Sequence, residues 1–268
     1  MGSTFLYGGN VHANGIRQHY LRYGGRGPAI ILVPGITSPA PTWGFVAERF
    51  GRNFDIYILD VRGRGLSEAS PGLDYGLDAM AADIPAFAQA LGLTEYMLIG
   101  HSMGARNILR AVSRHGARPG RMVMVDPPVS GPGRRPYPSG LAWYVDSIRQ
   151  SLIGMDREGM RPFCPSWTDE QLQLRAEWLH TCDERAIVDA YNSFQTEDIH
   201  ADFPRIPCPA MLMVAGKAEV IPPADRDEIR AINPAIDIRV VETAGHMIPW
   251  DDEEGFYRAF GDFLGKPV

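Results

Sequence analysis

A serine lies between two glycines in the segment "GHSMG", residues 100–104, directly after a run of apolar residues. A serine hydroxyl is a weak nucleophile unless the backbone exposes it and a nearby base takes its proton. The G-x-S-x-G spacing is typical of a sharp turn from a strand into a helix, where glycines keep side chains out of a crowded bend. The pattern predicts Ser102 as a nucleophile between a strand over Tyr96–Ile99 and a helix from Met103 to about His115.

Such a nucleophile needs a base, and the expected chain order is serine, then an acid, then histidine. His246 lies in "TAGHMIPW" after the last predicted strand, so its loop reaches the sheet edge where Ser102 lies. His101 precedes the serine, and we interpret it as a packing residue of the turn. We therefore expect His246 to take the proton of Ser102.

Two carboxylates could accept the second N–H of His246 and fix the tautomer of its ring. Asp126 ends the strand "RMVMV" and is followed by two prolines, whose restricted backbone would hold its direction. Glu219 follows the next strand, in "AGKAEVIPP", and its longer side chain has no such brace. The sequence favours Asp126 as the acid, with Glu219 as the alternative.

The oxyanion that forms during attack on a carbonyl needs two N–H donors. One is expected from the backbone of Met103, the residue after the nucleophile. The other is expected from Ile36, in the loop "VPGIT" that follows the first parallel strand. These two backbone groups are the predicted oxyanion hole.

Apolar runs alternate with segments of helical periodicity over most of the chain. Runs such as "AIILV", "DIYIL" and "AMLMV" predict strands that are buried on both faces. Asn14 and Gly15 predict a hairpin turn near the start, and Asp78 is the expected N-cap of a helix that carries Met80 and Ile84. The alternation predicts a mainly parallel sheet with helices on both faces.

The alternation stops after Asp126. The segment "DPPVSGPGRRPYPSG" is rich in proline and glycine, and no strand is predicted again until about Ala210. Helices are predicted instead, one with a capping box at Thr168 and Gln171 and one with an apolar stripe at Leu141, Val145, Ile148 and Leu152. We expect a core of residues 1–130 and 206–268 and a helical cap over residues 131–205.

Composition argues against several classes of partner. The 268 residues include 26 Lys and Arg against 32 Asp and Glu, a net charge of -6 that disfavours nucleic acid. Cys164, Cys182 and Cys208 are scattered and predict neither a disulfide framework nor a zinc site. Neither a membrane-spanning run nor a secretory signal is recognisable, so we expect a cytoplasmic protein without a membrane partner.

Together these motifs resemble the α/β-hydrolase fold family. The likeness covers nearly the whole chain, through "LVPGITSPAPTW", "LDVRGRGLSE", "GHSMGA", "VDPP" and "TAGHMIPW". It implies an α/β-hydrolase fold, an eight-stranded mostly parallel sheet flanked by helices, with a helical cap inserted after strand 6. Family members usually carry the acid as G-x-x-D after the penultimate strand, where residues 216–219 here read Gly-Lys-Ala-Glu. This departure favours Asp126, a position that some members use.

Segments such as "GGNVHANGIRQHYLRYGG", "VDPPVSGPGRRPYPS" and "AGHMIPWDD" resemble, within that family, the deformylases of aerobic nicotinate degradation. The resemblance implies a metal-free serine hydrolase without a cofactor, which cleaves the formyl C–N bond of N-formylmaleamate to maleamate and formate. This small substrate is anionic, so an arginine should hold its carboxylate. The candidates are Arg62, Arg64, Arg106, Arg134, Arg135 and Arg161, with Arg106 and Arg62 preferred, and Trp143 is expected to close the pocket.

The same side chains would also serve other functions, because a fold does not determine a substrate. The alternatives are a carboxylesterase, a lactonase or a C–C bond hydrolase that acts on a ring-cleavage product. A non-catalytic receptor for a small ligand is a further alternative, which an intact set of serine, acid and histidine argues against.

Overall fold

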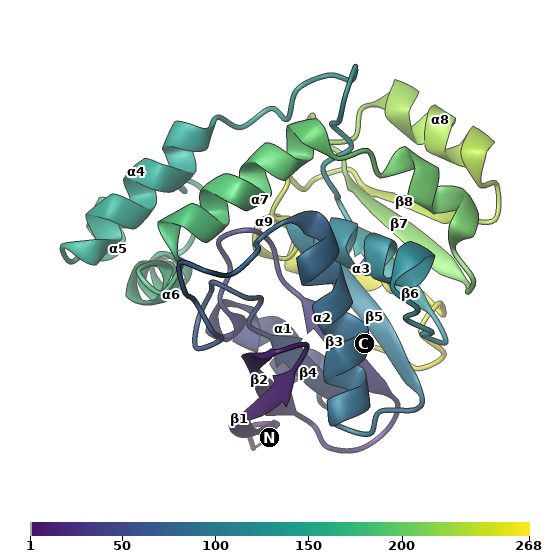
Figure 1. Ribbon diagram of the computed structural model, residues 1–268, viewed down its shortest axis with the longest axis horizontal. Helices are drawn as coiled ribbons and strands as arrows, with labels where there is room; N and C mark the ends of the chain where they lie inside the picture. Colours follow the sequence, from purple (N-terminus) through teal and green to yellow (C-terminus); the bar gives the residue numbers. More distant parts are fainter. Residues whose placement is uncertain (1) are drawn as a thin grey trace.

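The strands of the protein form one sheet in the order β1-β2-β4-β3-β5-β6-β7-β8, seen in Figure 1 in the computed structural model, which describes residues 2–268. β1 (Phe5–Ala13) and β2 (Ile16–Tyr23) form an antiparallel hairpin, and β2 pairs antiparallel with β4 (Asp55–Leu59). The remaining neighbours are parallel. The predicted eight-stranded, mostly parallel sheet is confirmed.

The inner parallel strands are largely apolar because both of their faces are covered. The other strands are β3 (Ala29–Val33), β5 (Tyr96–His101), β6 (Met122–Val125), β7 (Ala210–Ala215) and β8 (Asp237–Val241). In β3, Ile31 packs into the cluster that contains residues of α2 and α3, whereas Ile30 and Leu32 pack into the cluster on the opposite face. Successive side chains of a strand point to opposite faces, so a strand between two helical layers is hydrophobic throughout.

Helices cover both faces of the sheet. One layer contains α2 (Leu77–Ala90) and α3 (Met103–Arg114), and the other contains α1 (Gly44–Phe50) and α10 (Glu253–Phe260). The core also contains η1 (Ala40–Trp43), α8 (Pro223–Ile232) and α9 (Ile248–Asp251). Within residues 2–268, none of the helices has the length and apolar character that crossing a membrane requires.

The expected N-cap at Asp78 is wrong, because α2 begins at Leu77 with Gly76 as its N-cap. Asp78 lies in the first turn instead, where its carboxylate accepts hydrogen bonds from Arg110 (2.9 Å) and pairs with His115 (2.7 Å). A carboxylate in the first turn of a helix is also favoured by the helix dipole.

Helices replace strands between β6 and β7, as predicted. They are α4 (Leu141–Leu152), α5 (Arg157–Met160), α6 (Asp169–Leu179), α7 (Glu184–Thr196) and η2 (His200–Arg205), and Figure 1 shows α4 to α7 grouped together at one side of the sheet. The capping box is present, with the Thr168 side chain accepting from Gln171 N and the Gln171 side chain accepting from Thr168 N. The limits of the cap at residues 131 and 205 stay a prediction.

Candidate active site

Ser102 occupies the turn between β5 and α3 in a conformation that L-residues rarely adopt, with φ 53° and ψ −119°. Its backbone N–H donates to Val125 O at 2.8 Å, which ties the turn to β6. A Cβ on Gly100 would lie 2.4 Å from Gly104 O, and one on Gly104 would lie 1.9 Å from Val33 O. The flanking positions therefore require glycine, and the strained turn holds the serine at the end of the strand.

His246 lies between Ser102 and Asp126 and hydrogen-bonds to both. Its Nε2 is 2.9 Å from Ser102 Oγ, and its Nδ1 is 2.7 Å from Asp126 Oδ2. The second carboxylate oxygen, Asp126 Oδ1, accepts from Ala215 N at 3.1 Å. An ionised carboxylate beside Nδ1 requires the proton to be there, which leaves Nε2 as an acceptor for the serine proton.

Glu219, the alternative acid, is exposed, and the carboxylate that hydrogen-bonds to His246 is that of Asp126. Its backbone carbonyl accepts a hydrogen bond from Arg135 at 2.6 Å. The structure brings Asp126 to His246, and it leaves Glu219 in the solvent-exposed loop after β7.

His101 packs beneath the serine turn and holds the loop that carries His246. Its Nε2 donates to the backbone carbonyl of His246 at 2.9 Å, and the two rings lie 5.0 Å apart between centroids. Complete burial lowers the pKa of His101 from 6.5 to about 3, so the ring is neutral at physiological pH. The interpretation of His101 as a packing residue agrees with these contacts.

The N–H groups of Ile36 and Met103 have no hydrogen-bond acceptor among residues 2–268, so both are available to a ligand. Met103 begins α3, where the first N–H groups of the helix have no partner within it. A Cβ on Gly35 would meet His101 Nδ1 at 3.0 Å and Ser102 Cβ at 3.4 Å, so a glycine lets this loop approach the serine closely. Buried Arg64 holds the same loop by donating to Ile36 O at 3.0 Å.

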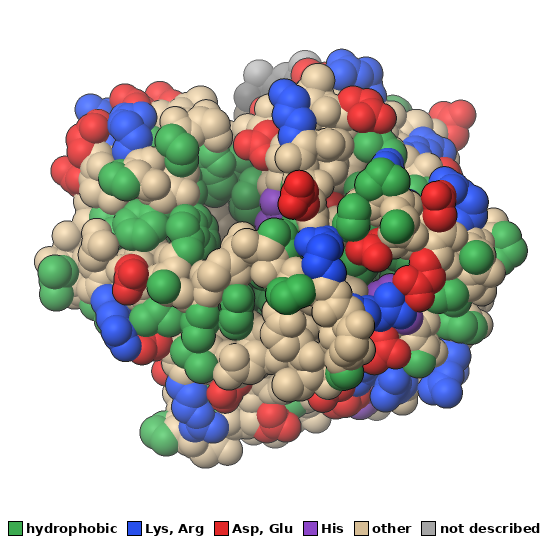
Figure 2. Space-filling model, turned by 90° about the horizontal axis from the view of Figure 1, so that it is seen from above, with side chains coloured by type: hydrophobic (Ala, Val, Ile, Leu, Met, Phe, Trp, Pro, Cys, Tyr) green, Lys and Arg blue, Asp and Glu red, His purple; other side chains and the backbone are tan. Residues whose placement is uncertain are grey.

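A cavity of about 380 Å³ opens above Ser102. The core contributes Ile36, Ser102 and His246 to its wall, and the segment between β6 and β7 contributes mainly aromatic side chains, namely Tyr137, Trp143, Tyr144, Phe163 and Trp167. Figure 2 shows a hollow in the molecular surface with hydrophobic side chains and a histidine at its edge. No group of three or more His, Cys, Asp or Glu side chains in residues 2–268 is placed to bind a metal ion.

Comparison with known proteins gives the family. Residues 30–259 match the model of the Alpha/beta hydrolase family. The chain belongs to this family. A relative in Pseudomonas putida (strain KT2440), N-formylmaleamate deformylase, is 65% identical over 266 residues, which cover 99% of each chain.

Solved structures give the same family fold. The crystal structure of a serine-to-alanine variant of the N-formylmaleamic acid deformylase Nfo from Pseudomonas putida S16 is 53% identical and has a TM-score of 0.91, covering 95% of this chain and 100% of that one. An enol-lactonase from Burkholderia xenovorans LB400 has a TM-score of 0.77 at 21% identity, over 96% of this chain and 100% of its own. The second likeness concerns the fold alone.

The two preferred arginines of this α/β hydrolase do not reach the cavity, so their prediction as substrate ligands is wrong. Arg106 is fully buried and donates to four backbone carbonyls, at 2.7 Å for both Pro128 O and Glu197 O. Arg62 is buried against Asp83, with hydrogen bonds of 2.7 and 2.6 Å. Both side chains hold parts of the fold together, because they donate their hydrogen bonds to residues of other segments of the chain. Trp143 does line the cavity.

Sequence reasoning missed Arg175, which lines the cavity from α6. This side chain is only 4% exposed and donates to Thr37 O at 3.1 Å and to Thr37 Oγ1 at 3.0 Å. A signal for it was present in the sequence. Arg175 shares the spacing of the buried face of α6 with Leu172, Ala176 and Leu179, and an arginine on an apolar helical face needs a reason to be there.

Proposed function

We propose that this α/β hydrolase cleaves the formyl C–N bond of N-formylmaleamate to give maleamate and formate, a reaction of nicotinate degradation. The observation that carries the proposal is the 65% identity, over 99% of both chains, with the N-formylmaleamate deformylase of Pseudomonas putida. The cavity above Ser102 has room for a small molecule of this kind. Ser102 supplies the nucleophile that the reaction needs, and His246, which is hydrogen-bonded to it, supplies the base.

In the first half of the proposed reaction, Ser102 Oγ attacks the formyl carbon. His246 Nε2, at 2.9 Å, accepts the serine proton as the C–O bond forms. Asp126 stabilises the resulting imidazolium through the 2.7 Å hydrogen bond to Nδ1. The buried carboxylate thus offsets the positive charge where water is excluded.

The negative charge on the formyl oxygen is received by the N–H groups of Ile36 and Met103. These donors are fixed before the reaction, and Met103 adds the positive end of the α3 dipole. His246 then gives its proton to the imide nitrogen, the C–N bond breaks, and maleamate leaves. A formyl ester remains on Ser102.

In the second half, a water molecule attacks the formyl ester and His246 takes its proton. The ester bond breaks, the proton on His246 goes to Ser102 Oγ, and formic acid leaves and ionises to formate by releasing its own proton to the solvent. One water molecule is consumed for each maleamate and formate produced. In this account, residues 131–205 act as a cap that supplies the aromatic walls of the cavity, and residues 1–130 with 206–268 carry the reacting groups.

Incubation of the purified protein with N-formylmaleamate tests the function. We expect formate and maleamate in equal amounts and a kcat/KM for N-formylmaleamate well above that for a simple ester such as 4-nitrophenyl acetate. Fast turnover of simple esters with no formate from N-formylmaleamate would favour the carboxylesterase alternative instead.

A further inference from the structure

The guanidinium of Arg175 is a buried charge without a carboxylate partner among residues 2–268. Buried Arg62 pairs with Asp83. Buried Arg106 has no carboxylate partner either, but it donates to four backbone carbonyls. Arg175 has only the neutral oxygens of Thr37, and its Nε has no hydrogen-bond partner. Burial of an unpaired charge is costly, so an anion that completes the site would be bound favourably.

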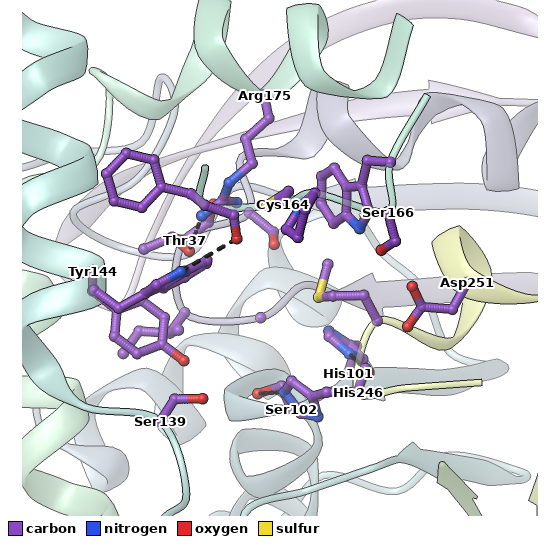
Figure 3. Close-up of a pocket in the computed structure, with 18 of the residues that line it drawn as sticks. Thr37, His101, Ser102, Ser139, Tyr144, Cys164, Ser166, Arg175, His246 and Asp251 are labelled. Carbon is purple, nitrogen blue, oxygen red and sulfur yellow. Dashed lines mark hydrogen bonds between the residues drawn. The ribbon is translucent and has the colours of Figure 1, made fainter. Parts of the chain in front are cut away.

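Arg175 also lines the cavity that Ser102 and His246 line. Of the described residues that line the cavity, it is the only Lys or Arg. Figure 3 shows Arg175 and Thr37 across the cavity from Ser102 and His246. The guanidinium carbon lies 5.4 Å from the ring centroid of Trp143 and 5.9 Å from that of Trp167, so aromatic rings flank the charge and exclude water from it.

The free hydrogen-bonding capacity of Arg175 matches a carboxylate. A guanidinium has five N–H donors in one plane, and Thr37 uses one on Nη1 and one on Nη2. Three N–H groups are left, one each on Nε, Nη1 and Nη2, and those of Nε and Nη2 lie along the same edge of the group. A carboxylate accepts such a pair of parallel hydrogen bonds.

We propose that Arg175 binds the carboxylate of the substrate and thereby selects anionic N-formyl amides. The inference rests on the proposed function, because N-formylmaleamate carries its carboxylate at the end of the molecule opposite to the formyl group. A carboxylate held at Arg175 directs the formyl carbon across the cavity to Ser102. The net charge of -6 gives an anion no general attraction, so the local cation accounts for the recognition.

A purely structural role for Arg175 predicts a different pattern. Thr37 follows Ile36, so the two hydrogen bonds from Arg175 also hold the loop that carries one oxyanion donor. Loss of that support would slow every substrate, whereas loss of a carboxylate ligand slows only substrates that carry the carboxylate. A pair of substrates that differ in this group separates the two roles.

The experiment compares N-formylmaleamate with its carboxyl methyl ester, with formate as the readout. We expect Arg175→Met to lower the ratio of kcat/KM for the acid to kcat/KM for the ester by about 10- to 100-fold, the range for a hydrogen bond to a charged group. Arg175→Lys, which keeps the charge and loses the planar pair of donors, should lower the ratio less. Arg149→Met is the matched control, because Arg149 is an exposed arginine of α4 that pairs with Glu184, and it should keep the ratio.

An unchanged ratio in Arg175→Met, with kcat/KM for the acid and for the ester lowered equally or not at all, would overturn the proposal. A second readout keeps this result separate from the proposed function. Inhibition of 4-nitrophenyl acetate hydrolysis by maleamate reports carboxylate binding without a deformylation step, and its inhibition constant should rise about tenfold or more in Arg175→Met. Absence of formate from wild type would contradict the deformylase function, while equal maleamate inhibition of wild type and variant, or none, would contradict the role of Arg175.

Discussion

Asp126 is held at both of its carboxylate oxygens, one by His246 Nδ1 and the other by Ala215 N. This arrangement follows from the position of Asp126 at the end of β6, beside β7 and below the loop that carries His246. The sequence predicted that Ser102, His246 and Asp126 would meet, because the serine motif and the chain order specify which strand ends carry them. It did not predict Arg175, because the arginine that faces the cavity is decided by how α6 packs on the loop after β3.

Replacement of the two candidate acids tests the assignment at this scale. We expect Asp126→Asn to lower kcat for formate release by about 10⁴-fold, because an amide cannot stabilise the imidazolium and favours the wrong tautomer of His246. Glu219→Gln should keep the wild-type kcat, since Glu219 is exposed and the carboxylate partner of His246 is Asp126. Steady-state kinetics on both variants, with circular dichroism to verify folding, gives the comparison. A collapse of kcat in Glu219→Gln alone would reverse the assignment.

The strand-turn-helix element around Ser102 depends on two glycines with no space for a side chain. The sequence predicted this element well, because apolar runs and glycine positions are local signals. It predicted α4 less well. The expected stripe places Leu152 in the core, whereas Leu152 is exposed and the buried face contains Tyr144, Ser147 and Ile148. That face is set by packing against α6 and α7, which periodicity alone does not specify.

Substitution of Gly104 tests how tightly this element is built. A Cβ at Gly104 would overlap Val33 O at 1.9 Å, and because that atom belongs to the backbone of β3, relief requires movement of the strand or the helix. We expect Gly104→Ala to lower the free energy of unfolding by about 3 kcal/mol. In the control Gly120→Ala, the nearest atom is Tyr96 O at 3.9 Å, so the change should be small. Urea denaturation measures both, and similar values for the two variants would contradict the proposed crowding.

At the scale of the whole molecule, two histidines that are buried in their neutral form, His101 and His200, make the stability depend on pH. Burial lowers the pKa of His101 to about 3 and also lowers that of His200. An unfolded chain takes up these protons near pH 6.5, whereas the folded chain does not. The unfolded state therefore binds more protons below about pH 6.5, and the free energy of unfolding falls as the pH is lowered through this range.

Comparison of wild type with His101→Gln isolates one of these protons. Glutamine can still donate to His246 O but does not titrate, so the variant should lose less stability between about pH 6 and pH 4, by up to about 1.4 kcal/mol per pH unit. Urea denaturation at a series of pH values gives the two slopes. Identical slopes would show that His101 takes up a proton in the folded protein as easily as in the unfolded chain.

The order of elements along the chain made the fold class of the molecule predictable, because buried strands that alternate with helices leave few other arrangements. The existence of helices between β6 and β7 followed from the absence of strand patterns there. How these helices close over Ser102 was not predictable, since it depends on contacts between residues far apart in the sequence. Arg175 donates to Thr37, and Trp167 stacks on Trp250.

Formate release from N-formylmaleamate by Ser102→Ala tests the central claim most directly. We predict a loss of about 10⁴-fold or more relative to wild type, because no other group can form the formyl ester. Ser113→Ala, which changes a serine near the other end of α3, should release formate at the wild-type rate. Wild-type formate release by a correctly folded Ser102→Ala would contradict the account.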